Sequence, residues 1–75
     1  MPVRKHSVTI AGHRTSFSVE DEFLSLLKWE AEADDRSLAS LVAEIDENRP
    51  RDSNLSSALR LHVLGKALQG RFSEA

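Results

Sequence analysis

Histidine and serine are the side chains of this sequence that could do chemistry by themselves, and their spacing gives them no catalytic setting. His6, His13 and His62 lack the spacing of metal ligands, and the chain has no cysteine to complete a zinc site. The serines, Ser37 and Ser40 among them, lie outside any G-x-S-x-G turn. A glycine-rich phosphate loop is also absent. We therefore expect a protein that is not an enzyme and that holds no metal or cofactor.

The length of the chain favours a single small domain over residues 1–75. A domain of this size buries only about 60% of the surface of its unfolded chain, so its stability alone is marginal. Because no disulfide can form without cysteine, oligomerisation is the remaining source of buried area. No apolar run approaches the roughly 18 residues that a membrane span needs, and no signal peptide opens the chain. These features predict a cytoplasmic protein with no membrane partner.

The charges are distributed unevenly along the chain, although the net charge is only −2. Residues 1–19 carry Arg4, Lys5 and Arg14 and no acid, which gives this segment +3. Residues 20–75 carry all 12 acids against 7 bases, which gives −5. This asymmetry predicts a basic face on an acidic body.

The N-terminal part alternates with a period of two, which is typical of half-buried strands. Over residues 14–19, Thr15, Phe17 and Val19 share one face, and the polar residues between them share the other. A shorter alternating run covers residues 7–10, and Ala11-Gly12-His13 between the two runs indicates a hairpin. We expect strands over residues 7–10 and 14–19.

Apolar residues recur with helical spacing from there on, and they predict helices over residues 20–34, 37–48 and 54–69. Ser18 is the expected N-cap of the first helix and Ser37 that of the second. Asp52 or Ser53 is expected to cap the third helix, which should stop at Gly70.

The third helix has apolar residues on two sides, more than one small domain can cover. Gly65 inside it indicates a close approach of another element, and His62 fits a half-buried structural imidazole. The acids of the first helix, Glu30 among them, are expected to form a solvated face.

The strand R-T-S-F-S-V, the helix start E-D-E-F and the second helix start R-S-L-A-S-L-V together resemble the ribbon-helix-helix family of bacterial repressors. The resemblance covers residues 14–45, and the flanking segments look like a subfamily with an added N-terminal strand and C-terminal helix. It implies a mostly α fold with a short β-ribbon: a β-hairpin and three helices per subunit, in an intertwined homodimer. One strand of each subunit would pair antiparallel, and this intersubunit ribbon would enter the major groove of double-stranded DNA. The implied function is sequence-specific transcriptional regulation, as a repressor.

The resemblance also assigns roles to individual residues. The outward strand residues would read bases: Arg14, Ser16 and Ser18. The start of the second helix would bind phosphate through its amides, with further help from the basic N-terminus: Ser37, Leu38, Ala39, Ser40, Arg4 and Lys5. The dimer core would consist of Phe17, Val19, Phe23, Leu27, Leu38, Leu41, Val42 and Ile45.

Two features depart from the family pattern. Asp35 stands where members of the family often carry glycine, and it could repel a nearby phosphate. If the added strand flanks the ribbon in both subunits, four strands about 4.8 Å apart form a sheet too broad for a groove about 12 Å wide. Either the outer strands bend away, which would bring Arg4 and Lys5 to the phosphates, or the sheet does not use the groove.

Two other functions therefore stay open on the sequence. The chain could be a protein-interaction module that keeps this fold, or an antitoxin-like protein that binds both DNA and a protein partner. A small helical dimer with no nucleic-acid role is a third possibility.

Overall fold

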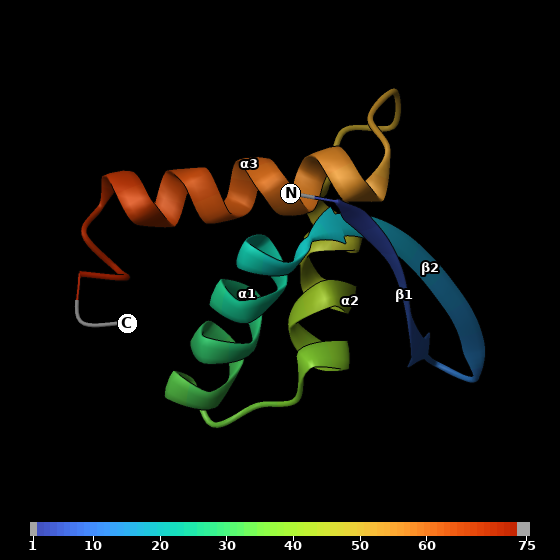
Figure 1. Ribbon diagram of the computed structural model, residues 1–75. Helices are drawn as coiled ribbons and strands as arrows, with labels where there is room; N and C mark the ends of the chain where they lie inside the picture. The colour runs from blue at the N-terminus through green and yellow to red at the C-terminus, as the bar shows by residue number, and fades with distance from the viewer. Residues whose placement is uncertain (1, 74–75) are drawn as a thin grey trace.

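The computed structural model describes residues 2–73 as a β-hairpin followed by three helices (Figure 1). The strands are β1 (Val3–Ile10) and β2 (His13–Glu20), which form a two-stranded antiparallel sheet. The helices are α1 (Asp21–Ala33), α2 (Leu38–Asn48) and α3 (Leu55–Leu68). The order of elements predicted from the sequence is confirmed.

The hairpin is longer than the alternation of residues predicts. Its two-residue turn has φ of 50° at Ala11 and 81° at Gly12, which fits the type I′ turns that match the twist of antiparallel strands. The ladder runs from Ile10 opposite His13 to Val3 opposite Glu20. Residues 3–6 belong to β1 although they include exposed charged side chains, because their main chain continues the pairing with β2.

The N-cap residue predicted from the sequence is confirmed for one helix and is wrong for the other two. The Ser37 hydroxyl accepts a hydrogen bond from the Ser40 N–H at 3.0 Å, as predicted. Ser18 does not cap α1, because β2 continues to Glu20, which is the N-cap and makes no side-chain cap hydrogen bond. The side chain of Asn54, rather than Asp52 or Ser53, caps α3.

Glycines and left-handed residues mark the ends of the helices. Gly70 follows the C-cap of α3 with φ of 79°, and this confirms the predicted stop. Asp35 has φ of 55°, the left-handed conformation that glycine adopts most easily, in the connection between α1 and α2. Within residues 2–73 no element makes the predicted close approach to Gly65, because a Cβ added there would meet nothing within 4 Å.

The core lies where the hairpin and the three helices meet. Figure 1 shows α3 crossing the ends of α1 and α2, with the hairpin along one side and its turn directed away from α3. The buried apolar side chains come from all elements except β1: Phe17, Val19, Leu27, Ala31, Leu41, Val42, Ile45, Leu55, Leu59 and Val63. The second apolar side of α3 is exposed, and Leu61, Leu64 and Leu68 have exposed fractions of 63%, 52% and 80%.

One acid of α1 contradicts the predicted solvated face. Glu30 is only 3% exposed, and its two carboxylate oxygens lie 2.9 and 3.1 Å from Nε2 of His62 on α3. His62 is half-buried, as expected. The pair joins α1 to α3, and it satisfies a carboxylate that would otherwise be buried without a partner.

Candidate nucleic-acid interface

The hairpin has a polar outer face opposite its core face. Residues paired across an antiparallel ladder point to the same side of the sheet, so the register places side chains of both strands together. Between the two ends of the sheet this outer face consists of Lys5, Ser7, Thr9, Arg14, Ser16 and Ser18. These six positions include two bases and no acid, and the acid next on the same face, Glu20 at the end of β2, is paired with Arg60. The hydroxyl oxygens of Ser7 and Ser16 lie 3.4 Å apart. Such a face offers hydrogen-bond donors and positive charge to a ligand.

The three residues predicted to read bases share this face but differ in their surroundings. Arg14 and Ser16 are exposed, whereas Ser18 is half-buried. The N–H of Ser18 donates to the hydroxyl of Ser56 at 2.9 Å, and its carbonyl accepts from Arg60 at 3.4 Å. The first turns of α3 therefore cover the main chain of β2 at Ser18.

Arg60 also binds the carboxylate that ends β2. Its Nε lies 3.1 Å from Oε1 of Glu20, so one guanidinium contacts both Ser18 and Glu20 of β2. The pKa of Glu20 is lowered from its ordinary value of 4.5, first by a hydrogen bond from its own backbone N–H and then by Arg60. Glu20 is therefore ionised at neutral pH and holds α3 against the end of the sheet.

The start of α2 is the second candidate contact. The hydroxyl of Ser40 accepts hydrogen bonds from Nε and Nη2 of Arg36, at 3.1 and 2.9 Å. Its N–H is engaged by the Ser37 cap. Within residues 2–73, the N–H groups of Ser37, Leu38 and Ala39 have no partner, as is usual at the start of a helix. These three amides are available to an anion.

The two bases predicted to bind phosphate occupy different positions. Nε of Arg4, at the start of β1, lies 3.3 Å from Oδ2 of Asp21, so this guanidinium already has a partner. Lys5 is exposed on the outer face.

Lys5 also borders a polar groove of about 430 Å³ between the hairpin and the starts of the helices. The groove has four basic or imidazole side chains and no acid, and it is lined by Lys5, His6, Ser7, Val8, Arg14, Phe17, Leu24, Lys28 and Leu38. Nε2 of His6 is buried and has no hydrogen-bond partner within the described residues. Lys28 is a candidate that the sequence reading missed, although its position four residues after Leu24 places it on the same side of α1.

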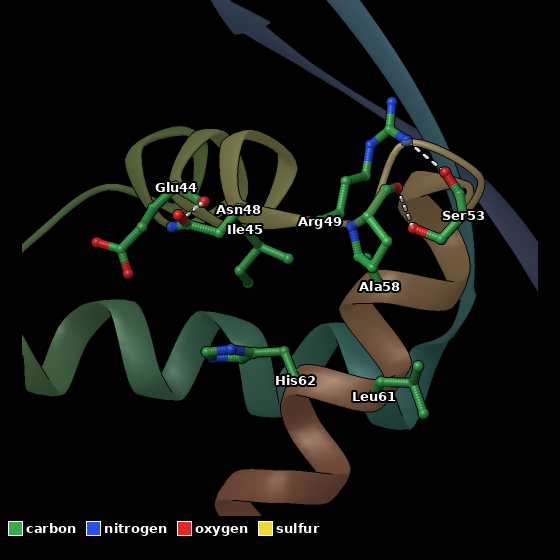
Figure 2. A pocket seen from close by; sticks show the side chains of 9 residues that line it. Glu44, Ile45, Asn48, Arg49, Ser53, Ala58, Leu61 and His62 are labelled. Carbon is green, nitrogen blue, oxygen red and sulfur yellow. Dashed lines mark hydrogen bonds between the residues drawn. The ribbon is translucent and has the colours of Figure 1, made fainter.

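A second groove, of about 380 Å³, lies between the C-terminal part of α2 and the start of α3 (Figure 2). Figure 2 shows Ile45 of α2 pointing toward α3, with Ala58 and Leu61 on α3. Its rim is polar, and there Arg49 contacts Asp46 at 2.7 Å and the carbonyl of Ser53. This groove is more suited to apolar groups than to an anion.

Comparison with known families assigns the chain. The family described as the ribbon-helix-helix domain matches residues 3–67, from the start of β1 to near the end of α3. The chain belongs to the ribbon-helix-helix family. No curated protein and no solved structure matches it. Domains of the ribbon-helix-helix family generally bind DNA as regulators. The matched residues include the whole hairpin and the helices α1 and α2.

The residues expected in the core of a ribbon-helix-helix dimer differ in how deeply they are buried in the single chain. Six of them are buried: Phe17, Val19, Leu27, Leu41, Val42 and Ile45. Phe23 and Leu38 are only partly buried and pack at the edge of this cluster. The sheet that the structure describes joins two strands of one chain, so the pairing between subunits belongs to the proposal below.

Within residues 2–73, no helix is long and apolar enough to cross a membrane. The three histidines lie on three different elements, His6 on β1, His13 on β2 and His62 on α3.

Proposed function

We propose that this protein is a dimeric transcriptional regulator, a repressor, that binds double-stranded DNA sequence-specifically through the outer face of its hairpin. The observation that carries the proposal is the row of basic and hydroxyl side chains from Lys5 to Ser18, which contains no acid in a chain with net charge −2. The family relationship supports it, because ribbon-helix-helix domains generally bind DNA. The protein would act in the cytoplasm, where bacterial DNA is accessible to it.

Base reading in this proposal depends mainly on Arg14. A guanidinium can donate two hydrogen bonds to O6 and N7 of one guanine, and this is the commonest specific contact in the major groove. The hydroxyls of Ser16 and Ser18 can donate or accept, so they fit several base edges but discriminate less. Arg14 has no ion-pair partner within the described residues, and its guanidinium is therefore available to DNA.

Phosphate binding would involve amides and lysines on either side of the ribbon. The amides of Leu38 and Ala39 point out of the positive end of α2, where backbone phosphate is favoured. The N–H of Ser37 lies beside these amides and would join the contact, whereas the N–H of Ser40 is held by the Ser37 cap and Ser40 would help to position them. Lys5 and Lys28 border the same groove as Leu38, and they would add charge to this contact. Arg4 contributes only if it leaves Asp21.

The width of the sheet limits how the ribbon enters DNA. Two hairpins joined through β2 make four strands, about 14 Å from first to last at a spacing of about 4.8 Å. A major groove about 12 Å wide admits the two central strands, and β1 of each subunit then lies at the rim. This arrangement assigns Lys5 to phosphate and leaves the bases to β2.

A salt series with purified protein and random-sequence duplex tests the proposal. Between about 50 and 200 mM salt, a protein with several phosphate contacts loses most of its nonspecific affinity, because bound counterions are released. We expect weak binding at the low end that declines steeply along the series, measured by electrophoretic mobility shift. Absence of a shift at the lowest salt would contradict DNA binding.

A protein-interaction role is the second candidate, and one observation favours it. The exposed side of α3 places Leu61, Leu64 and Leu68 in one row, and the apolar groove of Figure 2 begins beside Leu61. An exposed apolar row of this kind is typical of a surface that another protein covers. A protein that fails the salt series but keeps its fold would favour this function, including the antitoxin-like form.

A further inference from the structure

The direction of the backbone groups along β2 can be derived from its contacts. Both main-chain groups of Ser18 face α3, so they point away from β1. In an antiparallel ladder this direction alternates from residue to residue. The N–H and C=O groups of Arg14 and Ser16 therefore also point away from β1, along the outer edge of β2. The two-residue turn gives the same result. The residues that flank such a turn, here Ile10 and His13, form a hydrogen-bonded pair, so counting in steps of two along β2 makes Arg14, Ser16 and Ser18 the residues whose main-chain groups point away from β1.

The edge of β2 is thus open over one part and closed over another. Within residues 2–73, Arg14 and Ser16 have no hydrogen-bond partner for their outward main-chain groups. Ser18 is closed by Ser56 and Arg60. Unpaired edge groups of this kind are a template for another strand. The same edge of a second copy is complementary, because two copies related by a two-fold axis pair antiparallel.

We infer that α3 sets the register of the intersubunit ribbon and centres it on Thr15; this inference rests on the proposed dimer. With Thr15 opposite Thr15 of the partner subunit, Arg14 faces Ser16 of the partner subunit in both directions. All four open positions then exchange hydrogen bonds. A ribbon centred on Ser16 would instead place Arg14 opposite Ser18 of the partner subunit, whose groups α3 already holds.

The side chains support the same register. Thr15 is half-buried on the core face, and a non-hydrogen-bonded antiparallel pair brings two such side chains close enough for their hydroxyls to bond. On the outer face, each Arg14 then lies beside Ser16 of the partner subunit. The reading unit is therefore composite: one subunit supplies the guanidinium and the other supplies the neighbouring hydroxyl. Ser18 lies beyond the paired segment, and Ser56 and Arg60 act as positioning residues.

Cysteine cross-linking distinguishes the two registers, because the natural chain has no cysteine. Residues directly opposite each other have Cβ atoms about 4.5–5.5 Å apart, whereas diagonal neighbours lie about 7–8 Å apart. Disulfides do not form between Cα atoms more than about 7 Å apart without backbone movement. Under mild oxidation of the full chain, we expect Thr15→Cys to form covalent dimers at least tenfold faster than Ser16→Cys. Faster dimer formation by Ser16→Cys than by Thr15→Cys would overturn the register centred on Thr15, although the two subunits would still pair through β2.

A second measurement avoids the difference in exposure between Thr15 and Ser16. Size-tagged Arg14→Cys chains are mixed with Ser16→Cys chains, or with Ser18→Cys chains as the matched control. All three positions lie on the outer face. We expect the first mixture to give the mixed disulfide and the second to give at most a tenth as much. If no combination gives a cross-link, both the register and the proposed pairing of the two subunits are overturned. DNA binding is tested separately, by the salt series with the natural chain.

The role of α3 has its own test. Adding Ser56→Ala to Ser16→Cys frees the N–H of Ser18 for a partner strand. We expect covalent dimers of this double variant to form at least fivefold faster than those of Ser16→Cys alone, with the helix content checked by circular dichroism. A rate unchanged in the folded double variant would overturn the assignment of α3 as the element that sets the register.

Discussion

At Arg14, a single guanidinium carries most of the sequence preference that this surface can express. Replacing it with alanine should lower the affinity for a selected operator by about 1–3 kcal/mol and flatten the preference between sites. Fluorescence anisotropy with the selected site and a scrambled duplex measures both effects. Arg51→Ala is the matched control, because this exposed arginine lies outside the sheet. An equal loss in both variants would show that Arg14 contributes charge alone.

Lys28 illustrates a different kind of contact. If it meets phosphate, Lys28→Ala should weaken binding to all duplexes alike and reduce the slope of log affinity against log salt by about one unit. Lys66→Ala on α3 removes the same charge away from the groove, and we expect a smaller change in slope. Salt titrations of the three proteins provide the comparison. Identical slopes for the natural chain and Lys28→Ala would place Lys28 outside the interface.

Among elements, the contact between α3 and the end of β2 should depend on pH. The pKa of Glu20 is lowered in the folded chain, so its ionised form stabilises the fold above its ordinary value of 4.5. That stabilisation is lost as the pH falls through the lowered pKa. Urea unfolding should therefore show the natural chain to be more stable than Glu20→Gln at pH 7, with the difference shrinking in acid.

Glu22→Gln is the control for this pH series. Glu22 is an exposed carboxyl in the first turn of α1 and has no ion pair within the described residues. We expect its replacement to leave a small difference in stability at every pH. A difference between the natural chain and Glu20→Gln that stays constant from neutral to acid pH would contradict the link through Arg60.

The sequence predicts correctly those features of the helices and strands that depend on a few neighbouring residues. The Ser37 cap follows from a hydroxyl three residues before the amide that it accepts from, and the shared face of Arg14, Ser16 and Ser18 follows from the period of a strand. The wrong N-cap at Ser18 reflects the continuation of β2 to Glu20, a segment whose main chain is bonded at Ser18 to Ser56, 38 residues away.

The contacts that the sequence could not predict join different elements. Glu30 looked like one more surface acid, but His62 lies 32 positions further along the chain and packs beside it. Lys28 became a candidate only when the groove beside β1 placed it with Lys5. In both cases the packing of helices, rather than any pattern within one of them, decides the environment of the charge.

For the whole molecule, the proposed dimer makes stability depend on concentration. Association favours the folded state by mass action, and each tenfold rise in concentration contributes about 1.4 kcal/mol. For a unit of about 150 residues this corresponds to a rise in Tm of about 3–6 °C per tenfold. Thermal unfolding followed by circular dichroism over a hundredfold range measures it. A Tm independent of concentration would indicate that the single chain is the folding unit.

The contact between Ser18 and Ser56 has a consequence for how the molecule folds. Contacts inside the hairpin span fewer than 20 residues, whereas this one spans 38. Its loop closure costs more entropy, and we expect it to form late. A chain in which α3 has not yet docked exposes a longer edge of β2 than the native protein does. An open strand edge of this kind pairs with other copies, so we expect the docking of α3 to limit domain swapping and fibre growth during folding.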